Sequence, residues 1–159
     1  MAQTLIKNGK VVSTTGVIAQ DVLIDGETIR ALGAPGYFTE EGIDRIIDAG
    51  GKYVIPGGID VHTHMELPFG GTFASDTFET GSNAAAWGGT TTIIDMAVQR
   101  YGENVHEGLA EWHRKADGNC SIDYAFHQII GGVDDESLKA MKYLTEHEGI
   151  SSFKLFIWL

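Results

Sequence analysis

The sequence has one cysteine, few basic residues and no long apolar run, and each shortage excludes a class of protein. Because Cys120 is alone, no disulfide forms within the chain, and a small buried side chain is a simpler role for it than a nucleophile. The 11 lysines and arginines face 22 acidic residues, which leaves no basic stripe for nucleic acid or anionic lipid. No stretch of roughly 18 apolar residues exists to span a bilayer, and residues 1–15 lack a signal-peptide pattern. We therefore expect a cytoplasmic protein with no nucleic-acid or membrane partner.

The chain divides into two parts with different patterns of predicted strands and helices. Up to Val54, short β segments are separated by turn residues, with Asp25-Gly26 at a hairpin position. After Pro56, four apolar strands alternate with three helical stretches, and this alternation predicts parallel βα units in a barrel or a doubly wound sheet. We predict a small β unit over residues 1–54 and an α/β unit over residues 55–159. The predicted strands of the second unit contain GGIDVHTH, TTTIIDM, IDYAFHQII and SSFKLFI.

The segment IPGGIDVHTHMELPFGG, residues 55–71, carries the strongest chemical signal. Residues i and i+2 of a strand point to the same face, so His62 and His64 present two imidazoles side by side at the end of the first strand of the α/β unit. Neutral imidazoles suit zinc, and active sites collect at the carboxyl ends of parallel strands. An exposed or hydrogen-bonded histidine pair is the simpler alternative. The other histidines have no partner at ligand spacing; they are His106, His113, His127 and His147.

The stretch PGGIDVHTHMELPFGGTFASDTFETGSNAAAWGGTTTIIDM resembles the start of the catalytic barrel in the cyclic-amide branch of the amidohydrolase superfamily. The dihydropyrimidinases and D-hydantoinases are the most similar members. The N-terminal β unit resembles the small sandwich domain of that family, whose remaining strands come from the C-terminal end of the full chain. The resemblance implies an α/β protein in which residues 1–54 form a β-sandwich portion. Residues 55–159 would then supply strands 1 to 4, the first half of a TIM-type (β/α)₈ metal-dependent hydrolase barrel.

The resemblance also implies a metal centre. In the family the two histidines bind the more buried of two divalent ions, usually zinc, which assigns His62 and His64 to one ion. SSFKLF resembles the segment whose lysine is carbamylated by carbon dioxide, so Lys154 would bridge both ions. An ammonium beside two dications is strongly disfavoured, whereas a carbamate anion is a good ligand. Without the resemblance, a strand-end lysine with an apolar stem is the simpler interpretation of Lys154.

The implied activity is hydrolysis of the ring amide of dihydropyrimidines or 5-substituted hydantoins, small cyclic amides, by a homotetramer. Leu67, Phe69 and Phe156 correspond to apolar positions around the ring substituent of the substrate, although ordinary core packing explains them equally well. Asp95, the aspartate of IIDM, is not the family's catalytic aspartate, and we expect it to be a hydrogen-bonding or structural group at the rim of the site.

The family site also needs two histidines from strands five and six and an aspartate from strand eight. These positions lie beyond residue 159, so we expect no catalytic residue within this chain. A complete barrel takes about 250 residues, and we expect residues 55–159 to form a half-barrel. Relatives commonly continue FKLFMAY, whereas this chain ends with Ile157, Trp158 and Leu159. A frameshift, a truncation and a partial sequence each explain that difference.

Two alternatives to a hydantoinase-type enzyme stay open. A noncatalytic fragment or assembly module of the same superfamily is one, but such members typically lack the metal histidines that this chain keeps. Allantoinase or dihydroorotase is the other, and the long MELPFGGTFASD loop is more similar to that of hydantoinases. Metal content distinguishes the noncatalytic module from the enzyme, because the module is expected to bind no metal. The substrate that is hydrolysed distinguishes allantoinase or dihydroorotase from a hydantoinase-type enzyme.

Overall fold

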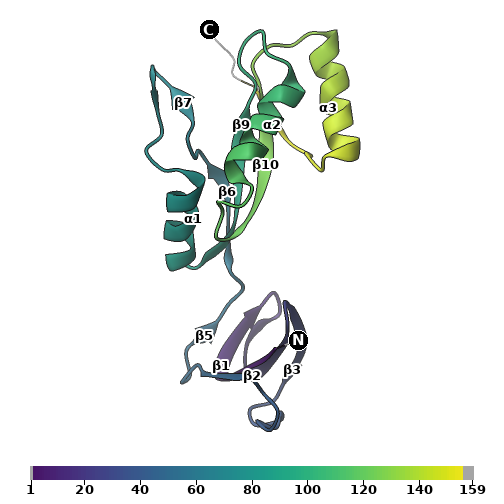
Figure 1. Ribbon diagram of the computed structural model, residues 1–159. Coiled ribbons are helices and arrows are strands. Elements are labelled where there is room, and N and C mark those ends of the chain that lie inside the picture. Colours follow the sequence, from purple (N-terminus) through teal and green to yellow (C-terminus); the bar gives the residue numbers. More distant parts are fainter. Residues whose placement is uncertain (1, 156–159) are drawn as a thin grey trace. The chain divides into compact units, whose positions relative to one another are not determined.

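The computed structural model describes residues 2–155, which form two compact units (Figure 1). The first unit is Met1–Pro56 and the second is Gly57–Leu159. Within residues 2–155, no helix is long and apolar enough to cross a membrane.

The first unit is one mixed sheet with the strand order β3-β2-β1-β4, and β5 also pairs with β1. Its long strands β1 and β2 are antiparallel, whereas β4 and β5 run parallel to β1. The expected hairpin is present, because Gly26 has φ 61° in the turn between β2 and β3. The strands are β1 (Gln3–Ser13), β2 (Gly16–Asp25), β3 (Thr28–Gly33), β4 (Arg45–Asp48) and β5 (Tyr53–Val54).

The second unit is a parallel four-stranded sheet with the order β11-β10-β9-β6, together with three helices. Four strands alternating with three helices confirm the predicted first half of a (β/α) barrel (Figure 1). The strands are β6 (Gly58–Thr63), β9 (Thr90–Val98), β10 (Asp123–Ile130) and β11 (Phe153–Leu155). The helices are α1 (Phe78–Trp87), α2 (Val105–Ala116) and α3 (Asp135–His147).

The apolar core lies between the three helices and one face of this sheet. Phe78 of α1, Trp112 of α2 and Leu144 of α3 are fully buried in one cluster with Ile93 of β9 and Phe126 of β10. Side chains alternate between the two faces of a strand. The strand positions next to these core residues therefore face away from the helices.

This alternation defines an inner face of the sheet, the face opposite the helices. The register pairs Met96 with His127 and Ile129 with Lys154, and cross-strand partners of a parallel ladder share a face. His127 and Lys154 therefore both lie on the inner face.

A short hairpin that the sequence analysis did not predict lies between β6 and α1. Its strands are β7 (Pro68–Phe69) and β8 (Thr72–Phe73), joined by Gly70 and Gly71 with φ 61° and 80°. Two consecutive glycines with positive φ suit a two-residue hairpin turn. The Pro/Gly-rich segment after His64 thus forms a β-hairpin, whose first strand is labelled β7 in Figure 1.

Candidate metal centre

The two predicted histidine ligands converge at the carboxyl end of β6. The Nε2 atoms of His62 and His64 are 3.1 Å apart, and the rings meet edge to face with centroids 4.9 Å apart. Two nitrogen ligands at about 2.0–2.1 Å from a tetrahedral zinc ion lie about 3.3 Å from each other. The separation of the two Nε2 atoms fits two donors of one coordination sphere, and it is also the length of a hydrogen bond between the two rings.

His64 is held in the form that binds metal. Burial lowers the pKa of its imidazole, and the positive charge of Lys154 and then His62 lower it further, while Asp95 acts in the opposite direction. The neutral imidazole is the form with a lone pair for a metal ion. The Nδ1 atom of His64 is buried and has no hydrogen-bond partner within residues 2–155.

Lys154 lies at the middle of β11, beside Ile129 of β10, and its charge acts on His64. The fold thus brings the three predicted metal residues to one end of the inner face, across 90 residues of sequence between His64 and Lys154. Among residues 2–155, no group of three or more His, Cys, Asp or Glu side chains is placed to hold a metal ion. Two imidazoles and a lysine fit part of a zinc site, in which lysine becomes a ligand only as a carbamate.

Asp95 supports the histidine pair from behind the sheet. Its carboxylate is 0% exposed and accepts hydrogen bonds from Thr63 Oγ1 at 2.7 Å and from the Met65 amide at 2.8 Å. The indole Nε1 of Trp112 donates to its other oxygen at 3.1 Å. Thr63 and Met65 flank His64 in the sequence, so Asp95 holds a side chain on one side of that histidine and the backbone on the other, and it ties both to α2.

His127 is a residue whose role the sequence analysis missed. Its Nε2 lies 2.9 Å from the carbonyl oxygen of Val61, and its Nδ1 is hydrogen-bonded to Ser152 Oγ. His127 has no second histidine at ligand spacing, so no metal-binding pattern in the sequence includes it. Its i−2 relation to the buried Ile129 was the available signal, since it predicts an inward-facing side chain in a strand.

The two predicted substrate residues that the structure describes, Leu67 and Phe69, have different environments. Leu67 is partly buried and packs against the core cluster, whereas Phe69 is 72% exposed on the hairpin. Phe156 lies outside the described residues, as do Ile157, Trp158 and Leu159.

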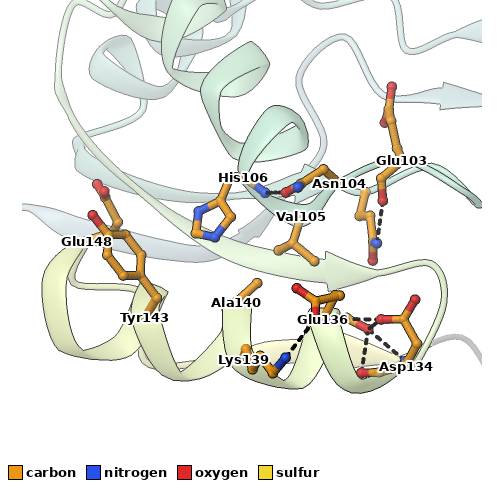
Figure 2. A pocket seen from close by; sticks show the side chains of 12 residues that line it. Glu103, Asn104, Val105, His106, Asp134, Glu136, Lys139, Ala140, Tyr143 and Glu148 are labelled. Carbon is orange, nitrogen blue, oxygen red and sulfur yellow. Dashed lines mark hydrogen bonds and ion pairs between the residues drawn. The ribbon is translucent and has the colours of Figure 1, made fainter.

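A cavity of about 600 Å³ lies elsewhere, between the start of α2 and α3 (Figure 2). Its polar side chains bind one another: Asp134 accepts from the Ser137 amide at 2.7 Å, and Lys139 pairs with Glu136 at 2.7 Å. His106 lines this cavity with its ring 5.1 Å from that of Tyr143. No predicted metal residue lines it, so the cavity is separate from the histidine pair.

Cys120 is expected to be unreactive at neutral pH. Burial raises the pKa of its thiol from 9.0 to about 11, with smaller contributions from the carboxylates of Asp95 and Asp117. Since only the thiolate reacts, alkylation by iodoacetamide at pH 8 should be about 100-fold slower in the folded chain than in urea. The rate should keep rising about tenfold per pH unit up to about pH 11. Equal rates in the folded and unfolded protein at pH 8 would contradict this prediction.

Nearly the whole chain is similar to known proteins. The sequence model of the amidohydrolase family matches residues 53–139. A D-hydantoinase of Streptomyces coelicolor is 54% identical over 158 residues, which are 98% of this chain and 34% of that protein. A dihydropyrimidinase of Rattus norvegicus is 41% identical over 156 residues, 96% of this chain and 30% of that one. A solved D-hydantoinase structure superimposes with a TM-score of 0.91 at 40% identity, covering 100% of this chain and 34% of that chain. The chain thus spans about a third of the length of these relatives.

Proposed function

Because this chain belongs to the amidohydrolase family, in its dihydropyrimidinase and D-hydantoinase group, we propose that it supplies part of the metal centre of a cyclic amide hydrolase. The proposed reaction is hydrolysis of the ring amide of dihydropyrimidines or 5-substituted hydantoins. It is assigned to the complete gene product that contains these residues, since the matched part is about a third of each relative.

His62 and His64 are proposed to hold one divalent ion, with zinc as the ion that their nitrogen donors suit best. The observation that carries this proposal is the 3.1 Å separation of their Nε2 atoms. The lowered pKa of His64 favours the neutral donor, and Asp95 holds both sequence neighbours of His64 by hydrogen bonds to the Thr63 hydroxyl and the Met65 amide.

Lys154 is proposed to act as a carbamate that bridges to a second ion. Its neutral amine nitrogen bonds to the carbon of carbon dioxide, one C=O π bond becomes a C–O⁻ group, and the nitrogen releases a proton. The product is an anion with two oxygen donors, placed on the inner face that also carries the histidine pair. When bound, such ions polarise a carbonyl group and lower the pKa of water toward neutrality.

The residues of this chain then have two separate tasks. The histidines and the lysine are proposed to carry donor atoms, and Asp95 holds the histidine strand through the Met65 amide. A noncatalytic module would need none of these donors. A dihydroorotase structure is only 21% identical to this chain and therefore supports the fold alone.

The test is an assay of the complete gene product with 5,6-dihydrouracil, a 5-substituted hydantoin, dihydroorotate and allantoin as substrates. We expect ring opening of the first two, and about two metal ions per chain by elemental analysis, as in two-metal hydrolases. A protein that binds no metal and opens none of the rings would contradict the proposal and favour the assembly module. Turnover of only dihydroorotate or only allantoin would be compatible with the proposed metal centre. It would identify the activity as that of a dihydroorotase or an allantoinase.

A further inference from the structure

We propose that His127 is a positioning residue that couples the strand with the metal histidines to the strand with the metal lysine. This inference rests on the proposed function of His62, His64 and Lys154. It adds a residue that itself binds neither metal nor substrate.

His127 lies between the two strands that it connects. It belongs to β10, and β9 separates β10 from β6 in the sheet order. Backbone ladders join only neighbouring strands. The imidazole nevertheless reaches the Val61 carbonyl of β6 at 2.9 Å, so it links two strands that share no ladder.

The chemistry of the two partners fixes the protonation of the neutral ring. A carbonyl oxygen only accepts, so Nε2 of His127 carries the proton and donates to Val61. Nδ1 is then the acceptor in the neutral imidazole and takes the hydroxyl proton of Ser152. Both ring nitrogens therefore make hydrogen bonds, Nε2 to Val61 of β6 and Nδ1 to Ser152 just before β11.

Each of these bonds holds a residue close to a proposed ligand, Val61 through its carbonyl group and Ser152 through its hydroxyl. The register between β6 and β9 is interrupted between Asp60 and Thr63, so the ladder there does not hold Val61 and His62 in regular pairing. Val61 immediately precedes His62, and its side chain is 56% exposed. The bond from His127 therefore holds the carbonyl group of the peptide that leads into the first metal histidine.

The other bond acts on the lysine strand. Ser152 precedes the three-residue strand β11 and lies two residues before Lys154, and its hydroxyl meets His127 on the inner face. Its carbonyl accepts from the Gln128 amide at 3.1 Å, while its hydroxyl binds His127. Backbone and side chain of Ser152 are thus both tied to β10. Residues that hold metal ligands in position contribute to metal affinity. Removing such a supporting contact typically weakens metal binding by about 10- to 100-fold.

The experiment measures metal affinity without using activity. The complete gene product is stripped and titrated with zinc against a competing chelator, and the variants are His127→Asn, His127→Gln and Ser152→Ala. We expect His127→Asn and Ser152→Ala to weaken zinc binding about 10- to 100-fold. His127→Gln, whose amide can still donate to Val61, should recover part of that loss. His147→Gln, an exposed histidine at the end of α3, is the matched control and should bind zinc like the parent.

A second readout follows Lys154 directly. Incubation with carbon-13 bicarbonate gives a carbamate signal in the NMR spectrum, and Ser152→Ala should reduce its intensity at equal zinc concentration. Ser152→Ala removes only the hydroxyl that binds His127, so we expect this variant to fold. It therefore tests the inference even if His127→Asn does not fold. Zinc affinity within twofold of the parent in Ser152→Ala and in any folded His127→Asn protein would overturn the inference. Failure of the parent itself to bind zinc would instead overturn the proposed function.

Discussion

Replacing Lys154 by alanine is expected to lower kcat/KM of the complete gene product by about 1,000-fold, because metal ions supply several kcal/mol of transition-state stabilisation and each 1.4 kcal/mol is about tenfold in rate. Alanine has no nitrogen to form a carbamate, so the proposed bridge between the two ions is lost. The measurement is steady-state hydrolysis of dihydrouracil together with metal content. A chelator should produce a loss of similar size in the parent.

Two further variants separate loss of the bridge from loss of a lysine. Lys142→Ala removes an ammonium from α3 that is 75% exposed, and it should leave the rate unchanged. Small carboxylates such as propionate should partly restore Lys154→Ala, since they bring two oxygen donors to the vacated space. Full activity of Lys154→Ala, or of the parent after prolonged treatment with chelator, would refute the metal mechanism.

Replacing Asp95 by alanine is expected to lower the free energy of unfolding by about 3–5 kcal/mol. The substitution leaves the Thr63 hydroxyl, the Met65 amide and the Trp112 indole without their acceptor, and each unpaired buried group costs about 1–3 kcal/mol. These costs are not additive, so the total lies below their sum. Urea denaturation of the metal-free protein, followed by circular dichroism, measures the change.

Variants that remove fewer of these hydrogen bonds should lower the free energy of unfolding by smaller amounts. Trp112→Phe removes a single donor, so it should cost less than Asp95→Ala, and Asp95→Asn should fall between them. Asp123→Ala, at the exposed start of β10, is the control and should stay within about 0.5 kcal/mol of the parent. If Asp95→Ala destabilises the protein by no more than the control, Asp95 does not support the histidine strand.

The order of strands and helices could be predicted because it depends on local patterns. Apolar runs separated by helical periods gave the four parallel strands, and Asp25-Gly26 gave the hairpin between β2 and β3. The approach of His62 to His64 is equally local, since two residues on one strand share a face whatever surrounds them.

The contacts of the buried polar residues could not be predicted in this way. Trp112 is 17 residues from Asp95 in the sequence, and Thr63 is 32 residues from it. The two partners of His127 are separated from it by 66 and 25 residues. No period or motif specifies pairs at such distances, because they depend on which strands become neighbours and in which register.

The sequence by itself determined the chain's family, its alternating elements and the residues able to donate to a metal ion, because residue type and spacing along one strand or helix carry that information. Only the tertiary structure decided which side chains support those donors. Folding places Asp95 behind the histidine strand and His127 across the inner face of the sheet, and burial makes each of their hydrogen bonds costly to lose.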